Sequence, residues 1–171
     1  MKLIPLNRSV KRGIPGCLHT WIFQVVDYAL VDDHWFDRLT VMGMWMLWNN
    51  KKTGLQYAWL QGTVPKVFMH QVVFGNKWPD HKDGNGLNNQ ESNLRPATRS
   101  QQAANRKLRR TSTSGEPGVS WHGGNRKWLV YVKQHGKRVF SKYFSDKGEA
   151  IRVAREQRVL FHGEFVRQVA N

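Results

Sequence analysis

The sequence has one cysteine and no long apolar run, and both shortages limit what the chain can be. A single thiol, Cys17, excludes an intramolecular disulfide and a structural zinc site built from cysteines. No apolar stretch reaches the roughly 18 residues that a membrane-spanning helix needs, and the first residues lack the form of a signal peptide. We therefore expect a soluble protein of a reducing compartment, the cytoplasm, with no membrane partner.

Acidic residues are also scarce. The chain has 12 Asp and Glu against 27 Lys and Arg, so its formal net charge is +15. The excess is concentrated between Arg95 and Lys142, where Glu116 is the only acid. Nucleic acid is the partner that best explains such an excess, because each neutralised phosphate releases condensed counterions.

The organisation of the chain is that of two small domains. Its 171 residues, 40% of them hydrophobic and with eight Trp and eight Phe, are enough for packed cores. Residues 111–117 form a short polar stretch with Gly and Pro, which is typical of a linker. We predict an α+β protein with a first domain over residues 1–110 and a second over 118–171.

Local patterns predict most elements of the first domain. We expect a helix capped by Asp32 or Asp33, a hairpin, and a second helix (or buried strand) ending at Gly75, followed by strand, loop, strand and helix. The ranges are 34–39 for the first helix, 44–48 and 55–60 for the hairpin, 67–74 for the second helix, and 78–108 for the remainder, with a basic helix at 99–108. Residues 1–26 have no recognisable pattern.

The second domain is predicted to be a three-stranded sheet backed by one helix. The strands are expected at 118–121, 128–133 and 138–144, and the helix begins after Asp146 and ends at Gly163. Alternation divides the strands into two faces. The side expected to pack on the helix carries Val119, Trp121, Trp128, Val130, Val132 and Val139. The opposite side carries Ser120, His122, Tyr131, Lys133, Arg138 and Phe140.

Chemistry is concentrated in residues 80–95, DHKDGNGLNNQESNLR. Asp80 supplies a hard oxygen ligand for a divalent cation, and His81 supplies a base that titrates near neutrality. Gly84 and Gly86 tolerate positive φ, so the backbone can fold back between the two ends of this segment. A lone Asp-His pair is typical of a surface turn, but the whole spaced set on a basic chain favours a catalytic loop.

The segment resembles the HNH endonucleases of phages and mobile introns over roughly residues 67–107. The residues that carry the resemblance are Met69-His70, Asp80–Gly86, Asn88-Asn89, Asn93–Arg95, Thr98 and Gln101. The resemblance implies a ββα-metal site around one Mg²⁺ or Mn²⁺ ion, within a core at about 67–108. It implies Asp80 as metal ligand, His81 as general base, and Asn93 as the residue that orients His81 and fixes the loop. It also implies that Asn89 stabilises the turn.

The third signature position of that family, on the helix, carries Gln102 where Asn or His is usual. Gln keeps the amide oxygen but adds a methylene, so its ligation of the metal requires the side chain to fold back. Asn105, one helical turn further on, is the alternative ligand. His70 lies in the apolar run 67–74, where we expect a hydrogen-bonded core or interface histidine.

The second domain resembles the Apetala/ethylene-response-factor type of DNA-binding domain over roughly residues 115–164. The residues that carry this resemblance are Gly118-Val119, Lys127-Trp128, Gly136–Arg138, Tyr143-Phe144 and Glu149-Ala150. That family lays its sheet in the major groove, which implies DNA contacts by Ser120, His122, Tyr131, Lys133, Arg138 and Phe140. The chain departs from the family at Ser141-Lys142, where a Leu-Gly pair is usual.

Together these patterns predict a phage-encoded homing endonuclease that acts on double-stranded DNA in the bacterial host cell. We expect a monomer that nicks or cuts the DNA and leaves 5′-phosphate and 3′-hydroxyl ends, as the resemblance implies. The basic side chains expected along the phosphate backbone are Arg95, Arg99, Arg106, Lys107, Arg109 and Arg110. The alternatives are a non-catalytic, regulatory DNA-binding protein with a degenerate HNH site, and an RNA-binding protein.

Overall fold

The computed structural model describes residues 1–12, 20–51, 53–75, 79–105, 108 and 112–166. The chain divides into two compact units, Met1–Pro96 and Ala97–Asn171. Helices and sheets occur in both units, including a three-stranded antiparallel sheet in the second, so the predicted α+β class is confirmed. Among the described residues, no helix is long and apolar enough to cross a membrane.

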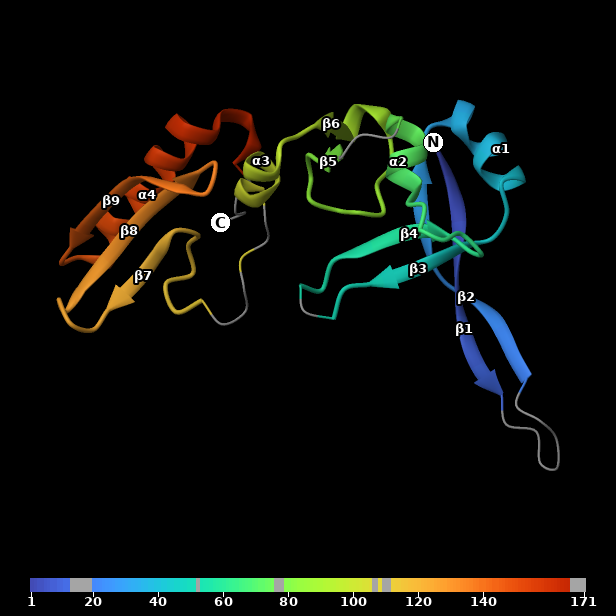
Figure 1. The fold of residues 1–171 in the computed structure, drawn as a ribbon, viewed down its shortest axis with the longest axis horizontal. Coiled ribbons are helices and arrows are strands. Elements are labelled where there is room, and N and C mark those ends of the chain that lie inside the picture. Colours follow the sequence, from blue (N-terminus) through green and yellow to red (C-terminus); the bar gives the residue numbers. More distant parts are fainter. Residues whose placement is uncertain (13–19, 52, 76–78, 106–107, 109–111, 167–171) are drawn as a thin grey trace. The chain divides into compact units, whose positions relative to one another are not determined.

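The first unit is built on a four-stranded sheet made of two hairpins, in the order β2-β1-β3-β4 (Figure 1). A single parallel pair, Asn7 with Met46, joins the hairpins. The β3–β4 hairpin confirms the strands predicted there, whereas the β1–β2 hairpin forms largely from the segment without a recognisable pattern. The strands are β1 (Lys2–Arg12), β2 (Thr20–Val31), β3 (Trp45–Asn49) and β4 (Gln56–Leu60).

Two helices and a short strand pair complete this unit. Helix α1 (Asp33–Val41) begins after Asp32, as predicted, although the Asp32 carboxylate accepts hydrogen bonds from Gln90 and Glu91 rather than from its own helix. Helix α2 (Met69–Phe74) ends at Gly75, whose φ of 76° suits a residue without a side chain. The prediction of a helix rather than a buried strand there is confirmed. The short strands are β5 (Pro79–His81) and β6 (Leu94–Pro96).

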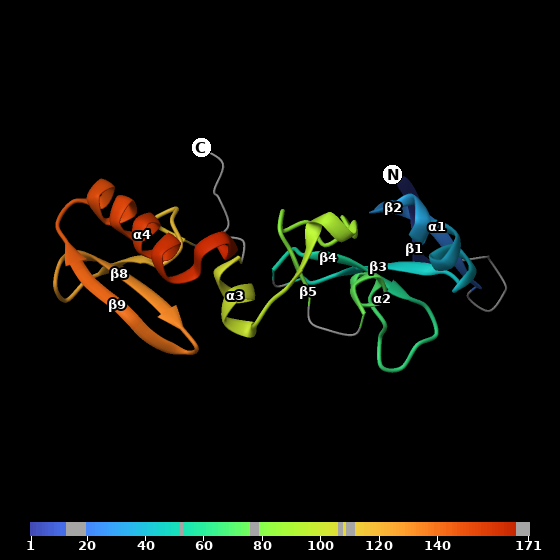
Figure 2. The same ribbon diagram turned by 90° about the horizontal axis from the view of Figure 1, so that it is seen from above.

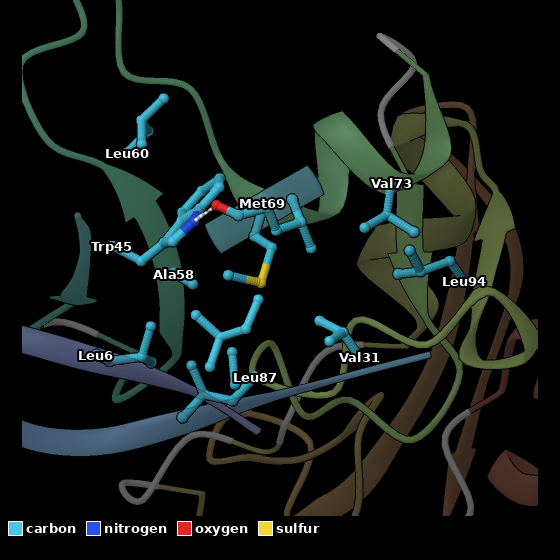
Figure 3. Close-up of a cluster of buried hydrophobic side chains, with 12 residues drawn as sticks. Leu6, Val31, Trp45, Ala58, Leu60, Met69, Val73, Leu87 and Leu94 are labelled. Carbon is cyan, nitrogen blue, oxygen red and sulfur yellow. Dashed lines mark hydrogen bonds between the residues drawn. The ribbon is translucent and has the colours of Figure 1, made fainter. Parts of the chain in front are cut away.

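A buried apolar core anchors the segment around the candidate site (Figure 3). Trp45 is fully enclosed, and its indole Nε1 donates a 2.8 Å hydrogen bond to the carbonyl oxygen of Leu39 at the end of α1. Leu87 and Leu94 bring the loop between β5 and β6, and β6 itself, into contact with the same cluster. Each such buried side chain contributes about 1.5–3 kcal/mol, so the core holds the loop at its middle and at its C-terminal end. The cluster consists of Ile4, Leu6, Ala29, Val31, Leu39, Trp45, Ala58, Leu60, Met69, Val73, Leu87 and Leu94.

The second unit contains the predicted three-stranded antiparallel sheet, with a long helix along one face (Figure 2). The Asp146 carboxylate accepts a 2.6 Å hydrogen bond from the backbone N–H of Glu149, which caps the helix at the predicted residue. Ala150 and Ala154 of this helix pack on Val119, Val130 and Phe144. The elements are α3 (Arg99–Ala104), β7 (Val119–His122), β8 (Lys127–Gln134), β9 (Lys137–Phe144) and α4 (Lys147–His162).

The predicted division of this sheet into faces is wrong for β9. The pairing of β8 with β9 shifts between Val132 and Lys133, so that Val132 faces Phe140, Lys133 faces Arg138, and Val139 is an extra residue. This bulge moves Phe140 to the helix side, where it packs against the buried cluster, and leaves Val139 exposed. Phe140 is therefore not placed on the face expected to contact DNA.

A buried ion pair fixes the segment between α3 and the sheet. The Glu116 carboxylate is 1% exposed, and it accepts hydrogen bonds from Arg158 at 3.0 Å and from Arg155 at 2.9 Å. Arg158 also donates to the carbonyl oxygen of Ala104, the last residue of α3. The boundary between the units thus lies at Pro96, upstream of the predicted linker at 111–117, and the predicted first domain spans both units.

We expect Glu116→Gln to lower the free energy of unfolding by about 3–5 kcal/mol, because it leaves the Arg158 guanidinium buried without a counter-charge. Glu156→Gln is the matched control, since it removes an equivalent charge from an exposed ion pair with Arg152 and should change the stability by about 0.5 kcal/mol or less. Urea unfolding at pH 7 measures both. Equal losses in the two variants would contradict a structural role for the buried pair.

Candidate functional site

The β5–β6 pair places the predicted catalytic residues at the base of one loop. Asp80 lies opposite Arg95, and His81 lies opposite Leu94 in an antiparallel register. The backbone N–H of Lys82 then donates to the carbonyl oxygen of Asn93 at 2.9 Å, which closes the loop between the two strands. The predicted order of strand, loop and short strand is confirmed.

Asn93 holds this loop in shape. Its amide nitrogen donates to Asp83 Oδ1 at 3.0 Å and to the carbonyl oxygen of Asn88 at 2.8 Å. Its amide oxygen accepts a 3.1 Å bond from the backbone N–H of Asp83. One side chain therefore ties both ends of the turn together, which agrees with the part of its expected role that concerns the loop.

The loop is pressed against β4 at Gly86. A Cβ atom added there would lie 2.2 Å from the carbonyl oxygen of Gln56 and 2.5 Å from the ring of Tyr57, so no other residue fits without a shift. On its other side the loop hydrogen-bonds β2, because Leu30 donates to the carbonyl oxygen of Leu87 and accepts from the N–H of Asn89, both at 2.8 Å. The loop is therefore a fixed part of the first unit.

His81 is buried and is oriented by Asn89. The ring atom Nε2 lies 3.3 Å from Asn89 Oδ1. The Asn89 amide nitrogen donates to Met69 Sδ and to the carbonyl oxygen of Leu87, so the amide oxygen is the atom that faces the imidazole. Nε2 must then carry the proton, and the lone pair lies on Nδ1. The expectation that Asn93 orients the histidine is corrected, because Asn89 makes this contact.

The surroundings of His81 favour its neutral form. Burial lowers the pKa of the imidazole below its usual value of 6.5, although the hydrogen bond to Asn89 and the carboxylates of Asp83 and Asp80 partly oppose this effect. A neutral ring at pH 7 can accept a proton. His81 is thus held in the protonation state that a general base requires.

Asp80 is paired with Arg95 inside the unit. The guanidinium donates to Asp80 Oδ2 through Nε at 3.1 Å and through Nη2 at 2.9 Å, and both side chains are buried. Arg95 was expected on the surface that contacts the phosphate backbone. The structure instead places it as the partner of Asp80, because it lies directly opposite that residue in the β5–β6 register.

The aromatic rings of His70 and Tyr57 lie beside His81. The sequence predicted a different role for His70 and gave Tyr57 no role. His70 meets His81 edge to face at a centroid distance of 5.2 Å, and Tyr57 lies 5.9 Å from the same ring. His70 also stacks on Phe68, and its Nδ1 is buried with no hydrogen-bond partner, so the expected hydrogen bond is not found at this atom. Met69-His70 belongs to the HNH-like segment and hinted at His70, whereas nothing in the sequence pointed to Tyr57.

Asp80 is the predicted metal ligand in the first unit, and its carboxylate is the type of oxygen donor that hard divalent ions prefer. Within the ranges that the structure describes, no three His, Cys, Asp or Glu side chains gather into a closed metal cage. Mg²⁺ is commonly held by one or two carboxylates together with water and substrate phosphates, so it does not require a closed cage of protein ligands. The buried, unpartnered Nδ1 of His70 adds a further polar atom beside the same cluster.

The remaining predicted residues lie in the second unit. Gln102, Asn105 and Arg99 belong to α3 and its C-terminal end, and Arg99 is exposed. This helix starts at a capping box between Thr98 and Gln101 and ends at Ala104, earlier than the predicted Leu108. Four predicted DNA-binding residues lie outside the described part of the chain, namely Arg106, Lys107, Arg109 and Arg110.

The sheet face turned away from α4 is cationic and aromatic. The guanidinium carbon of Arg138 lies 5.1 Å from the centre of the Tyr131 ring, and Lys133 Nζ lies 6.0 Å from it. His122 meets Tyr143 edge to face at 5.3 Å, so Tyr143 joins this face although the sequence analysis did not include it. Ser120 lies on the same face through its pairing with Leu129, which in turn faces Tyr143.

His70 generates a prediction for the stability of the protein in acid. Its pKa is lowered from 6.5 to about 3, chiefly by burial. Between these pH values the unfolded chain binds a proton that the folded chain does not, so the free energy of unfolding falls as the pH falls, by up to about 1.4 kcal/mol per pH unit. We expect His70→Phe, which keeps the ring contacts, to weaken this dependence in urea unfolding at pH 7.5, 6.5, 5.5 and 4.5. A surface control, His34→Ala, should retain the wild-type slope, and an unchanged slope in His70→Phe would contradict the assignment.

Comparison with known proteins supplies a relationship for about half of the chain. No family model matches the sequence, and no solved structure matches it. Protein 3.8 of Escherichia phage T7 is 34% identical over 88 residues, which cover 52% of this chain and 72% of the phage protein. A match of this identity over most of the relative shows common descent. The chain belongs to the family of Protein 3.8 of phage T7.

Proposed function

We propose that this protein is a metal-dependent DNA endonuclease of the HNH type, which hydrolyses phosphodiester bonds in double-stranded DNA. The observation that carries the proposal is the state of His81. Its ring is buried and kept neutral, and Asn89 fixes the tautomer with the lone pair on Nδ1. Asp80, a carboxylate suited to a hard cation, is its neighbour in β5.

In the proposed reaction His81 is the general base. It takes a proton from a water molecule whose oxygen forms a new bond to phosphorus, while the bond from phosphorus to the 3′ oxygen of the neighbouring nucleotide breaks. The leaving oxygen takes a proton from solvent, so the products are a 5′-phosphate and a 3′-hydroxyl. Asn89 keeps the imidazole in the required tautomer, and Asn93 keeps the loop closed beside it.

Asp80 is the proposed ligand of Mg²⁺ or Mn²⁺. When bound, such an ion neutralises charge on the phosphate and on the leaving oxygen. Arg95 holds the Asp80 carboxylate through two hydrogen bonds, which fixes its direction inside the unit. Gln102, or Asn105, is the proposed helix ligand that the HNH resemblance implies.

The exposed face of the β7–β9 sheet is the proposed DNA-reading surface. Arg138, Lys133 and His122 supply cations and hydrogen-bond donors for phosphates and base edges, and Tyr131 and Tyr143 supply rings for contacts with sugars or thymine methyls. Ser120 is a further hydroxyl on this face. Arg99 and the basic residues 106, 107, 109 and 110 are proposed contacts with the phosphate backbone.

The relative in phage T7 supports the proposal that the protein is phage-encoded and acts in the cytoplasm of an infected bacterium. A homing endonuclease, which cuts DNA at a chosen site, is the class that combines a nuclease with a separate reading module. This class is our proposal for the chain.

A non-catalytic, DNA-binding regulatory protein is the second candidate. The observation that favours it is the pairing of Asp80 Oδ2 with the Arg95 guanidinium, which gives the carboxylate a structural partner. In this alternative Asp80 and Arg95 stabilise the β5–β6 pair, the loop is a scaffold, and the sheet face alone carries the function.

A cleavage assay separates the two candidates. We expect the protein to convert supercoiled plasmid into open circles or linear DNA with Mg²⁺ or Mn²⁺ but not with EDTA. His81→Ala should lower the rate by at least about 100-fold, the usual contribution of a general base. His34→Ala is the matched control, because His34 is exposed and lies outside the proposed site, so its rate should stay at the wild-type value. Tight, salt-sensitive binding with no cleavage under any divalent ion would favour the regulatory protein.

A second assay tests the reading surface. We expect Arg138→Ala to weaken DNA binding by about tenfold and to reduce the slope of log K against log salt by about one, as for one lost phosphate contact. Arg152→Ala removes the same charge from the exposed side of α4, and it should change the affinity by less than about twofold. Fluorescence anisotropy with a labelled duplex at several salt concentrations measures both. Equal effects of the two substitutions would rule out the sheet face as the binding surface.

A further inference from the structure

The β1–β2 hairpin carries a strip of exposed apolar side chains on one face. Trp21 is 60% exposed, Phe23 43%, Val25 45% and Tyr28 52%, and all four lie on β2. Leu3, on β1, extends the strip at the end nearest the chain start. Scattered surface apolar residues are normal, but a contiguous run of large ones marks an interaction site. These five residues form the outer strip.

The strand register explains why these side chains share a face. Phe23 pairs with Ser9, Val25 with Asn7, and Tyr28 with Pro5, so all lie on the side of the odd-numbered residues of β1. The even-numbered residues Ile4 and Leu6 point into the core. A bulge at the register shift between Leu6 and Asn7 keeps Val25 and Tyr28 on the same face although they are three residues apart. The outer strip is therefore the face opposite the core.

The sequence of β2 is that of a strand covered on both faces. It reads TWIFQVVDYALV, which is almost continuously apolar, whereas a strand with one solvated face alternates. Within the described residues, only the face carrying Ile4, Leu6, Ala29 and Val31 is covered by the core. Beyond Asn7, where β1 meets β3, the two strands pair with each other alone, and a two-stranded ribbon is marginal without a second layer.

The charge of the outer strip indicates which kind of partner it can bind. Residues 20–31 contain no Lys or Arg and a single acid, Asp27, in a chain of net charge +15. A surface for DNA needs cations, which are placed elsewhere in this chain. Repulsion between two copies of so basic a protein is weakest where cations are absent, and β2, which carries four of the five residues of the outer strip, has none.

We propose that the outer strip is a dimer interface, which packs face to face on the outer strip of a second copy of this chain. A two-fold axis brings the same residues together from both copies, so the contact is self-complementary and closes without forming a fibre. The β1–β2 hairpins become the two layers of a small sandwich, about 10 Å apart. This replaces the monomer expected from the sequence.

The available area is sufficient for such a contact. A large aromatic side chain buries about 150–250 Å² when fully covered. At their exposed fractions, the residues of the outer strip offer roughly 500 Å² of apolar surface per copy, or roughly 1,000 Å² for the pair. That is at the lower limit of specific interfaces, and its aromatic content is typical of the residues that carry binding energy. The dimer does not depend on the proposed nuclease activity.

Sedimentation velocity of the full chain over a range of concentrations tests the proposal. We expect a monomer–dimer equilibrium in the wild type and a dissociation constant at least roughly 100-fold higher in Phe23→Lys/Val25→Lys, because two charges would be buried in the contact. Val159→Lys/Leu160→Lys is the matched control, since it adds the same charge to exposed apolar positions on α4 and should leave the equilibrium unchanged. Circular dichroism melting confirms that each variant is folded.

Hydroxyl-radical footprinting of the wild type gives a second readout that needs no substitution. Trp21 and Tyr28 should become protected as the concentration rises through the dimer transition, while Trp121 and Tyr143, which are exposed in the second unit, should react equally throughout. A wild type that stays monomeric at about 100 μM, a level far above useful affinities, would overturn the proposal. So would a dimer in which Trp21 remains reactive, or protection of Trp21 in a monomer by DNA, which would assign the outer strip to nucleic acid.

Discussion

In a chain with more than twice as many basic as acidic side chains, a buried carboxylate must be paired, and the fold depends on two such pairs. Asp80 is held by Arg95 across the β5–β6 register, and Glu116 is held by Arg155 and Arg158 of α4. Removing one partner of a buried pair leaves an uncompensated charge, which is among the most costly changes that a small protein can suffer. One pair lies in each unit: the first joins the paired strands β5 and β6, and the second joins the segment before β7 to α4.

The first of these pairs also determines what the candidate site can do. Arg95 holds Asp80 in β5, and the ring of the next residue, His81, is buried among aromatic and amide groups rather than in solvent. Burial lowers the pKa of the imidazole, while Asn89 decides which nitrogen carries the proton. The neutral ring with its proton on Nε2 therefore has two local causes: burial disfavours the charged form, and the hydrogen bond to Asn89 selects the tautomer while it partly opposes the effect of burial on the pKa.

Elements with strong local signals could be predicted from the sequence, and contacts between distant segments could not. Helix α4, its cap at Asp146 and the three strands before it follow from periodicity and turn residues. The β1–β2 hairpin escaped prediction because β2 is apolar on both faces and so lacks the alternation that marks a strand. Phe140 was assigned to the wrong face because a bulge, which has no reliable sequence signal, shifts β9 by one residue.

The same holds for the candidate site: its residues could be predicted from local sequence, but their contacts with distant segments could not. Asp80, His81 and Asn93 were predicted from residue type and spacing, and Asn93 does hold the loop. Asn89 and Asn93 lie in the same loop and have the same side chain, so the sequence could not show which of them contacts His81. Tyr57 reaches the site only because Gly86 lets the loop approach β4 closely, a contact between segments about thirty residues apart.

Basic residues are unevenly distributed along this chain. As a result, its apolar surface and its cationic surface suit different partners. Strand β2 has no cation, whereas the exposed face of the β7–β9 sheet is rich in Lys, Arg and aromatic rings. Electrostatic repulsion between two copies is weakest where cations are absent, and attraction to a polyanion is strongest where they gather. The outer strip lies in the first unit and the cationic sheet in the second, so the two proposed partners contact different units. In the proposed dimer two cationic sheets are linked, and binding of one of them to DNA raises the effective concentration of the other.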